Sequence, residues 1–156
     1  MTAVLDASAL LGFLQDEPGN NQVEAVLPEA VISSVNWAEV VQKSIAAGVD
    51  VDGLREDLEA LGLAILPFTA EEAEIAGQIW QQTRQYGLSL GDRACLSLGI
   101  RLNAQVLTAD QVWSDLNLPI TVHIIRSPIQ KFSPNEVYSR SGTSSSNSIL
   151  SAQSSG

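Results

Sequence analysis

Four carboxylates lie where one predicted element of the chain gives way to the next. Asp6 ends the first apolar run, and Asp110 lies two residues past the end of the fourth. Glu39 falls in the first turns of the helical pattern after the second run, and Asp92 opens a later helical pattern. Parallel sheets bind ligands at the carboxyl ends of their strands. The spacing therefore predicts that one edge of a sheet gathers these four acids.

Each acid also has a purely structural interpretation. Asp6 is placed to cap the helix that follows it, and the segments Asn36–Glu39, Ser89–Asp92 and Thr108–Gln111 all fit the capping-box pattern. Asp110 is also favoured in the first turn of a helix by the helix dipole. Taken singly, capping is the commoner role for an acid at these positions. Taken together, four acids at one edge point to a site.

Several carboxylates at one site repel one another and resist ionisation. A hard divalent cation such as Mg²⁺ or Mn²⁺ relieves this repulsion, because it prefers oxygen ligands. The sequence has one histidine and one cysteine, so it lacks the ligand set that selects zinc. Such a metal suits phosphoryl chemistry, because it lowers the pKa of a bound water and neutralises a phosphodiester. This chemistry needs no Ser or Cys nucleophile.

The elements that must position these acids are short apolar runs alternating with helical patterns. The runs are Ala3–Asp6, Ala30–Ser33, Ala64–Pro67, Gln105–Thr108 and Thr121–Ile125. Each has the length of a strand that is buried on both faces. Strands that alternate with helices predict an α/β fold, in which a parallel sheet of about five strands is covered on both faces.

The helical patterns lie between these runs. Apolar residues recur at helical spacing over Ala38–Ile45, Ala73–Thr83 and Cys95–Leu102, and Val51–Leu61 is typical of a further helix. The segment Thr69–Glu72 predicts a capping box at the start of one long helix that reaches Thr83.

Two hydroxyls and one cation accompany the acids. Ser8 and Thr108 are placed to orient Asp6 or metal-bound waters, and helix capping is an equally good explanation for both. Arg93 follows Asp92 and has the charge to contact a phosphate or an acid. A solvated or ion-paired arginine remains an equal alternative.

The remaining chemically capable residues have structural explanations. Trp37 and Trp80 lie within helical patterns, so we expect both to be buried rather than to stack on bases. Cys95 has the spacing of a core residue and is not expected to be a nucleophile. His123 is expected to be a structural histidine, and Asp16–Glu17 a solvated turn rather than an extension of the acidic site.

Composition and charge limit the possible partners. The 156 residues carry 18 acidic and 8 basic side chains, for a net charge of −10. This balance argues against passive binding to nucleic acid or to anionic membranes. No apolar run is long enough to cross a membrane, and the segment Met1–Val4 lacks a basic leader region, so we expect a cytoplasmic protein. One cysteine excludes an intramolecular disulfide.

The acidic residues and the elements lie almost entirely in residues 1–126, which we predict to be the functional domain. Residues 127–156 are rich in serine and poor in apolar side chains. We expect this tail to be disordered, because it cannot bury enough apolar surface to offset its ordering entropy.

Five segments of the domain carry a resemblance to a known family. Val4–Leu11 resembles the opening of PIN domains, and Glu17–Gly19 resembles a turn that often follows it in VapC-type toxins. Ile32–Val40, Leu88–Leu98 and Leu107–Trp113 resemble the second, third and fourth acidic motifs. All occur in order and with ordinary spacing. The chain is therefore similar to the PIN-domain ribonucleases that are toxins of type II toxin–antitoxin systems.

The resemblance implies a three-layer α/β/α sandwich and a Mg²⁺-dependent ribonuclease that cleaves RNA phosphodiester bonds. It implies that Asp6, Glu39, Asp92 and Asp110 bind the metal, directly or through water, and that the products carry 3′-hydroxyl and 5′-phosphate ends. It further implies a homodimer and a cognate antitoxin protein that blocks the site.

Other classes fit less well. A phosphatase of the haloacid dehalogenase type needs a second aspartate two residues after Asp6, where Ser8 stands. A receiver domain needs a lysine at a late strand end, and neither Lys43 nor Lys131 is suitably placed. No glycine-rich phosphate loop follows the first strand. The alternative that remains is a catalytically silent PIN-fold module that acts through protein contacts.

Overall fold

Five short strands form one parallel sheet in the computed structural model, which describes residues 2–125. The strands are β1 (Ala3–Leu5), β2 (Ala30–Ser33), β3 (Ala64–Leu66), β4 (Gln105–Thr108) and β5 (Val122–Ile124). Their order across the sheet is β3-β2-β1-β4-β5, so the first strand is central. The predicted α/β class is confirmed. The serine-rich tail 127–156 lies outside the described residues, and the boundary at 126 stays a prediction.

Helices connect the strands. They are α1 (Ala7–Leu14), α2 (Asn20–Val26), α3 (Ser34–Ala46), α4 (Leu54–Ala60), α5 (Ala70–Gln78), α6 (Trp80–Thr83) and α7 (Leu90–Leu102). Three short 3₁₀ turns complete the described part of the chain: η1 (Leu27–Glu29), η2 (Arg84–Tyr86) and η3 (Gln111–Asp115). Within residues 2–125, no helix is both long and apolar enough to cross a membrane.

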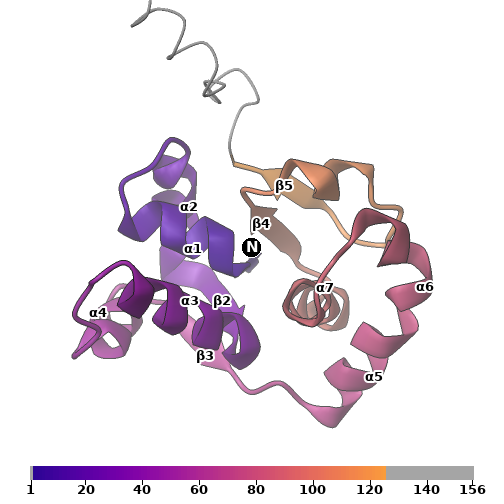
Figure 1. Ribbon diagram of the computed structural model, residues 1–156, viewed down its shortest axis with the longest axis horizontal. Coiled ribbons are helices and arrows are strands. Elements are labelled where there is room, and N and C mark those ends of the chain that lie inside the picture. Colours follow the sequence, from indigo (N-terminus) through magenta and orange to yellow (C-terminus); the bar gives the residue numbers. More distant parts are fainter. Residues whose placement is uncertain (1, 126–156) are drawn as a thin grey trace, which may run out of the picture. The chain divides into compact units, whose positions relative to one another are not determined.

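The strands bury alternate side chains in two separate cores, which makes three layers. Leu5 and Leu107 pack with α1 to α4 on one face of the sheet. Val4 and Val106 pack with α5, α7 and η3 on the other. Figure 1 shows these two groups of helices on opposite sides of the strands. This is the α/β/α sandwich that the sequence resemblance implies, with side chains alternating as the pleat requires.

The two edge strands differ from the prediction that every strand is buried on both faces. Ala64 of β3 and His123 of β5 are exposed, and their strand neighbours are only half-buried. The reason is their position, because an edge strand has one neighbouring strand and incomplete helical cover. An apolar run alone does not distinguish a central strand from an edge strand.

Three helical details also differ from the prediction. The long helix expected to reach Thr83 is divided at Ile79 into α5 and α6, although its predicted cap at Thr69 is present. The helix expected over Val51–Leu61 begins only after Gly53. The helix α2 was not predicted. It follows Gly19, which has a φ of 93° and where a Cβ would overlap the carbonyl oxygen of Ile125, so glycine is required there.

Candidate functional site

The candidate site lies at the carboxyl edge of the sheet. The central strands β1, β2 and β4 all end at this edge, and α1 and α3 begin there directly after β1 and β2. The N-terminal half of α7 packs against α3 beside them. This arrangement places residues that are far apart in the sequence at one edge, as the strand pattern predicted.

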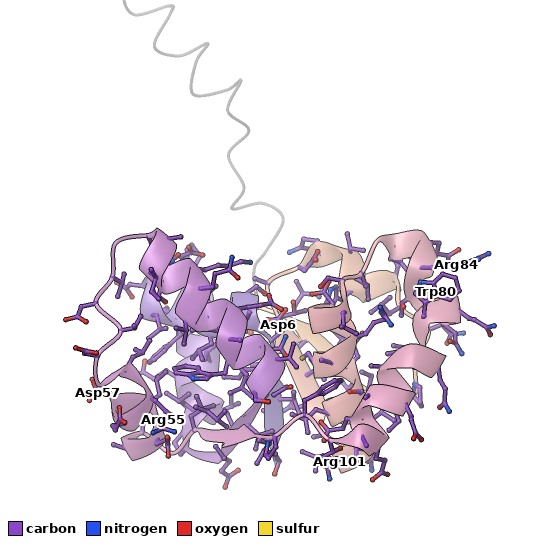
Figure 2. The ribbon with its side chains drawn as sticks, turned by 60° about the horizontal axis from the view of Figure 1, so that its bottom comes forward. Asp6, Arg55, Asp57, Trp80, Arg84 and Arg101 are labelled. Atoms are coloured by element: carbon purple, nitrogen blue, oxygen red, sulfur yellow. The ribbon has the colours of Figure 1, made fainter. Side chains whose placement is uncertain are left out.

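Asp6 is the most buried acid of this edge, with 4 % of its surface exposed. It is the N-cap of α1, and its Oδ1 accepts a hydrogen bond from the backbone N–H of Ala9 at 2.8 Å. The capping role and the predicted site role therefore belong to the same side chain. Figure 2 shows Asp6 in the centre of the molecule, between the two groups of helices.

Ser8 and Thr108 both donate hydrogen bonds to Asp6. The Ser8 hydroxyl lies 2.8 and 2.9 Å from the two carboxylate oxygens, and the Thr108 hydroxyl lies 2.5 Å from Oδ2. The Ser8 hydroxyl also accepts the backbone N–H of Ala109 at 2.9 Å. These bonds join the end of β1 to the end of β4 and fix the orientation of the Asp6 carboxylate.

The carboxyl group of Asp6 is hard to ionise in this environment. Burial raises its pKa from 3.8 to about 6, although the hydrogen bonds from Thr108, Ala9 and Ser8 act in the opposite direction. The negative charge of Asp92 raises the pKa further. Neutral donors therefore compensate only part of the cost of burying this charge.

Glu39 reaches the edge from α3, and Asn36 fixes its position. Asn36 is 1 % exposed, and its Nδ2 donates to the carbonyl oxygen of Gly91 at 2.9 Å, which joins α3 to α7. The Glu39 carboxylate lies directly over Gly91, where a Cβ would overlap its Oε1. Burial raises the pKa of Glu39; Lys43 opposes this shift, and Asp92 adds to it.

The predicted capping role of Asn36 is wrong. The helix α3 begins at Ser34, and Ser33 is its cap, because the strand runs directly into the helix. Asn36 is instead a positioning residue that sequence reasoning missed. The available signal was a polar residue on the buried face of an amphipathic helix.

Asp92 completes a capping box at the start of α7, as its spacing predicted. Its Oδ2 accepts the backbone N–H of Ser89 at 2.9 Å, and the Ser89 hydroxyl accepts the N–H of Asp92 at 3.1 Å. Asp92 is half-buried, and its charge acts on both Asp6 and Glu39. Three of the four predicted acids therefore interact electrostatically at one edge.

Asp110 lies beside this group but is exposed. Its Oδ1 accepts the backbone N–H of Val112 at 3.1 Å, which makes Asp110 the cap of η3. The capping box predicted for Thr108–Gln111 is therefore wrong. The Thr108 hydroxyl instead accepts the N–H of Asp110 at 3.1 Å and donates to Asp6. Asp110 is not among the charges that shift the pKa of Asp6 or Glu39.

Cys95 is fully buried beneath the three interacting acids. Burial raises the pKa of its thiol well above 9, and Asp6, Asp92 and Glu39 each raise it further. A thiol in this environment stays protonated and is not a nucleophile. The expected core role of Cys95 is confirmed.

Arg93 is half-buried and forms no ion pair with an acid among residues 2–125, and its predicted contact with a phosphate stays a prediction. Its Nη1 donates to the backbone carbonyl of Ala76 at 2.8 Å, and its Nε is buried without a hydrogen-bond partner. The guanidinium therefore links the first turn of α7 to α5.

The predictions for the aromatic residues and the histidine have mixed outcomes. Trp37 packs against the core, but Trp80, the first residue of the short helix α6, is 47 % exposed. His123 is exposed on the edge strand β5, so it is not a buried structural histidine. Asp16 is exposed in its turn, as expected.

The donor chemistry of this edge fits a hard divalent cation. The oxygen donors that it offers are carboxylates, and no cation is among the groups that shift the pKa of the buried Asp6. Beside Glu39, Oδ1 of Asn36 is also buried without a hydrogen-bond partner. In the present arrangement of the side chains of residues 2–125, no three His, Cys, Asp or Glu residues are close enough together to hold a metal ion. Metal binding would therefore need side-chain rotation or water ligands.

The sequence of this chain matches the PIN domain over residues 3–117. The chain therefore belongs to the PIN-domain family, and the resemblance drawn from its motifs is confirmed. Among curated proteins, none matches the chain.

Solved structures share its fold. A toxin–antitoxin complex from Klebsiella pneumoniae has 20 % sequence identity and a TM-score of 0.60, covering 76 % of this chain and 98 % of that one. VapBC2 from Rickettsia felis, bound to a DNA fragment from its promoter, has 19 % identity and a TM-score of 0.59 over 79 % and 98 % of the two chains. FitAcB from Neisseria gonorrhoeae has 20 % identity and a TM-score of 0.58 over 83 % and 99 %.

Proposed function

We propose that this protein is a Mg²⁺- or Mn²⁺-dependent endoribonuclease, with Asp6, Glu39, Asp92 and Asp110 as its catalytic and metal-binding residues. One observation carries the proposal: the Asp6 carboxylate is buried, the charge of Asp92 raises its pKa further, and no cation of residues 2–125 is among the groups that shift its pKa. Membership of the PIN-domain family supports nuclease activity. A divalent cation would supply the missing positive charge.

The chain's own residues have distinct tasks in this proposal. A bound metal would supply an activated water and would neutralise charge on the phosphodiester. Ser8 and Thr108 hold the carboxylate of Asp6 in one orientation, so that little reorganisation is needed when a cation binds. Asn36 holds α3 against α7, which keeps Glu39 near Asp92. Asp110 would contribute from the end of β4, next to Thr108.

We further propose that the protein is a VapC-type toxin of a toxin–antitoxin pair, that it forms a homodimer, and that it acts in the cytoplasm. The support is the shared fold with proteins from toxin–antitoxin complexes. A basic segment of the antitoxin protein is a suitable partner for the acidic edge, because the chain carries a net charge of −10.

The test compares Asp6→Asn with the full-length wild-type chain. RNA 5′ ends are sequenced after induced expression of each, and cleavage is then measured on the identified RNA with the purified proteins. We expect Asp6→Asn to lower the cleavage rate by at least about a hundredfold, because one charge that positions the metal is lost. Asparagine is also a good helix N-cap, so the fold should be retained.

Asp57→Asn is the matched control. It removes the same charge from an exposed position on α4, away from the carboxyl edge (Figure 2). We expect this variant to cleave RNA at the wild-type rate. Wild-type activity of Asp6→Asn, or an equal loss in both variants, would contradict the assignment of the site.

A catalytically silent PIN-fold interaction module is the second candidate. It is favoured by the observation that, among the described residues, the acids do not converge on one point as they lie. A titration of thermal stability with MnCl₂ separates the two. The nuclease predicts stabilisation of wild type by about 3 kcal/mol at a hundredfold excess over Kd, with none for Asp6→Asn. A silent module predicts no metal response in either.

A further inference from the structure

One exposed aromatic side chain is paired with a cation. Trp80 is 47 % exposed, and the guanidinium carbon of Arg84 lies 5.4 Å from the centroid of its ring. Figure 2 shows the two side chains together at the surface of the molecule. A ring and a guanidinium in this arrangement offer a stacking surface and a positive charge at the same place.

The charge of Arg84 is not neutralised by a neighbouring acid within residues 2–125. Arg55 is paired with glutamates of its own helix, and Arg101 is paired with the buried Glu72. Arg93 donates to a backbone carbonyl of α5. The chain has a net charge of −10, so its overall charge repels a polyanion. Arg84 therefore offers a polyanion a positive charge that no neighbouring acid among residues 2–125 neutralises.

Two contacts hold the segment from Trp80 to Tyr86 in place relative to the carboxyl edge. The Tyr86 hydroxyl donates to the carbonyl oxygen of Asp115 at 3.2 Å, which ties η2 to the turn that Asp110 caps. The bond from Arg93 to the carbonyl of α5 ties the first turn of α7 to the residues just before Trp80.

Figure 2 agrees with this placement. Asp6 is seen near the centre of the molecule and Trp80 and Arg84 at its upper right, whereas Arg55 and Arg101 are seen below them. An RNA strand that leaves the acidic edge in the direction of α6 would therefore meet Trp80 and Arg84.

We propose that Trp80 and Arg84 form a platform that binds a single-stranded segment of the RNA substrate. One base stacks on the exposed face of the Trp80 ring, and an adjacent phosphate contacts the Arg84 guanidinium. Stacking tolerates any base, because every base has a π-face. The inference takes its substrate class from the proposed function, and it adds how a strongly acidic protein retains RNA beside its acids.

Tryptophan fluorescence tests the platform in the full-length Asp6→Asn chain, in which the proposed cleavage is blocked. Trp113 is buried and Trp37 packs against the core, so quenching by a single-stranded oligouridylate reports on Trp80. We expect quenching in this parent chain. We expect its loss in Trp80→Ala, with a Kd for labelled oligouridylate at least about fivefold higher by fluorescence anisotropy. The same RNA in a duplex, whose base faces are covered, should bind without quenching.

Two arginine variants give the matched comparison of charge. Arg84→Ala should raise the Kd, whereas Arg55→Ala, which removes the same charge from α4, should leave it unchanged. Trp80→Phe keeps an aromatic ring and should retain part of the affinity, which separates lost stacking from lost folding.

The platform is overturned if oligouridylate does not quench the parent chain, or if Trp80→Ala binds it with the parent's Kd. The second result would leave the proposed function intact if the wild-type chain cleaves RNA and Asp6→Asn does not. Conversely, the wild-type chain could fail to cleave RNA while binding still depends on Trp80. That result would support the platform and contradict the proposed catalysis.

Discussion

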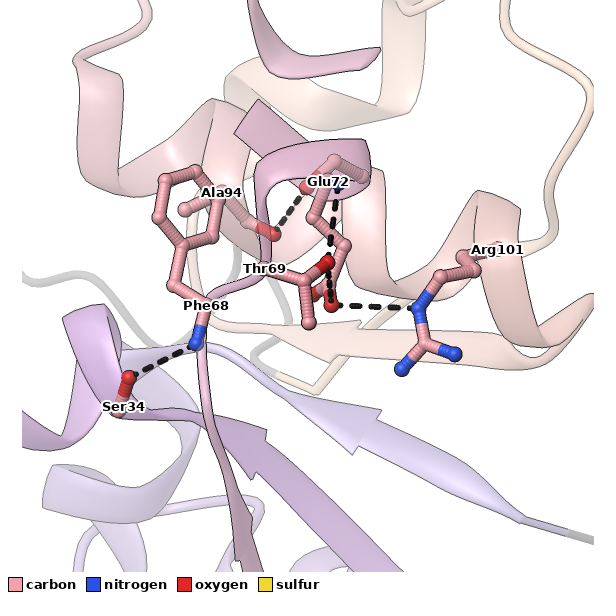
Figure 3. Close-up of polar contacts among 7 residues, drawn as sticks. Ser34, Phe68, Thr69, Glu72, Ala94 and Arg101 are labelled. Atoms are coloured by element: carbon pink, nitrogen blue, oxygen red, sulfur yellow. Dashed lines mark hydrogen bonds and ion pairs between the residues drawn. The ribbon is translucent and has the colours of Figure 1, made fainter. Parts of the chain in front are cut away.

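Two carboxylates are buried among residues 2–125, and their surroundings are opposite. Glu72 is completely buried between α5 and α7, where the Arg101 Nε lies 3.2 Å from its Oε2 and the Thr69 hydroxyl donates to the same oxygen at 2.9 Å (Figure 3). Asp6 receives only neutral donors and faces another acid. The interface between α5 and α7 neutralises its own buried charge. The carboxyl edge does not.

This difference separates a carboxylate that stabilises helix packing from the carboxylate that we propose as functional. Burying a charge is unfavourable unless it is paired, and pairing within the chain serves the packing of two helices. A buried carboxylate that no cationic side chain pairs with destabilises the fold. It gains a favourable partner only when a cation binds from solution. The comparison therefore explains why Asp6, rather than the more deeply buried Glu72, is proposed as the centre of the site.

The largest expected effect is a gain of stability when the unpaired charge is removed. Because the pKa of Asp6 is raised from 3.8 to about 6, its ionised form destabilises the fold by about 3 kcal/mol above pH 6. We expect Asp6→Asn to be more stable than wild type at about pH 8 without divalent metal. Urea unfolding measures the free energy of each chain.

The pH dependence has a defined sign. A carboxyl group with a raised pKa in the folded state stabilises the fold below its unfolded pKa, and this contribution is lost as the pH rises through about 6. The advantage of Asp6→Asn should therefore shrink as the pH falls from about 6 toward about 4. An advantage that is constant with pH would show that the Asp6 charge is not its cause.

The next effect has the opposite direction and concerns Glu72. Arg101→Met keeps most of the side-chain stem but leaves Glu72 buried without its cation. We expect a loss of about 2 kcal/mol, below the usual range for a buried pair, because the Arg101 side chain is 31 % exposed. Urea unfolding at neutral pH measures this loss.

The double variant Arg101→Met/Glu72→Gln provides the control for the charge. It should recover part of the lost stability, because no uncompensated carboxylate remains. If Arg101→Met costs no more than a typical surface ion pair, about 0.5 kcal/mol, the contrast between the two carboxylates is not electrostatic.

The smallest effect concerns the donors that partly stabilise Asp6. Thr108→Val removes one hydrogen bond to the carboxylate at nearly constant volume. We expect the pKa of Asp6 to rise above 6 and the stability at about pH 8 to fall by about 1 kcal/mol. Carboxyl NMR titration measures the pKa. Thr121→Val, at an exposed loop position, should change neither quantity, and an unchanged Asp6 pKa in Thr108→Val would contradict the role of the hydroxyl.

Much of the fold followed from local patterns. The residues of β2 and β4 match their predicted runs, and the caps at Thr69 and Ser89 lie where the capping-box spacing placed them. These features depend on neighbouring residues in the chain, so periodicity and capping chemistry suffice to find them. The unpredicted α2 follows Gly19, which packs against the distant Ile125, and local patterns do not record such a contact.

The site was predictable in composition but not in geometry. The four candidate acids could be singled out because all lie at junctions between elements, and parallel strands bring such junctions to one edge. The separate contributions of Asn36, Arg93 and Trp80 were not found. Each depends on what another helix presents to the side chain, and the same sequence pattern fits a cap, an ion pair or a core residue equally well.

The sequence by itself determined the alternation of strands with helices, the acids at their junctions and the membership of the PIN-domain family. The tertiary structure decided which of those acids is buried and which is exposed. It joined Asp6 to Thr108 and Asn36 to Gly91 across long stretches of chain. It also gave Glu72 a cation and left Asp6 without one. The physical reason is that helix and strand patterns are local, whereas desolvation and charge act through space between residues that only folding brings together.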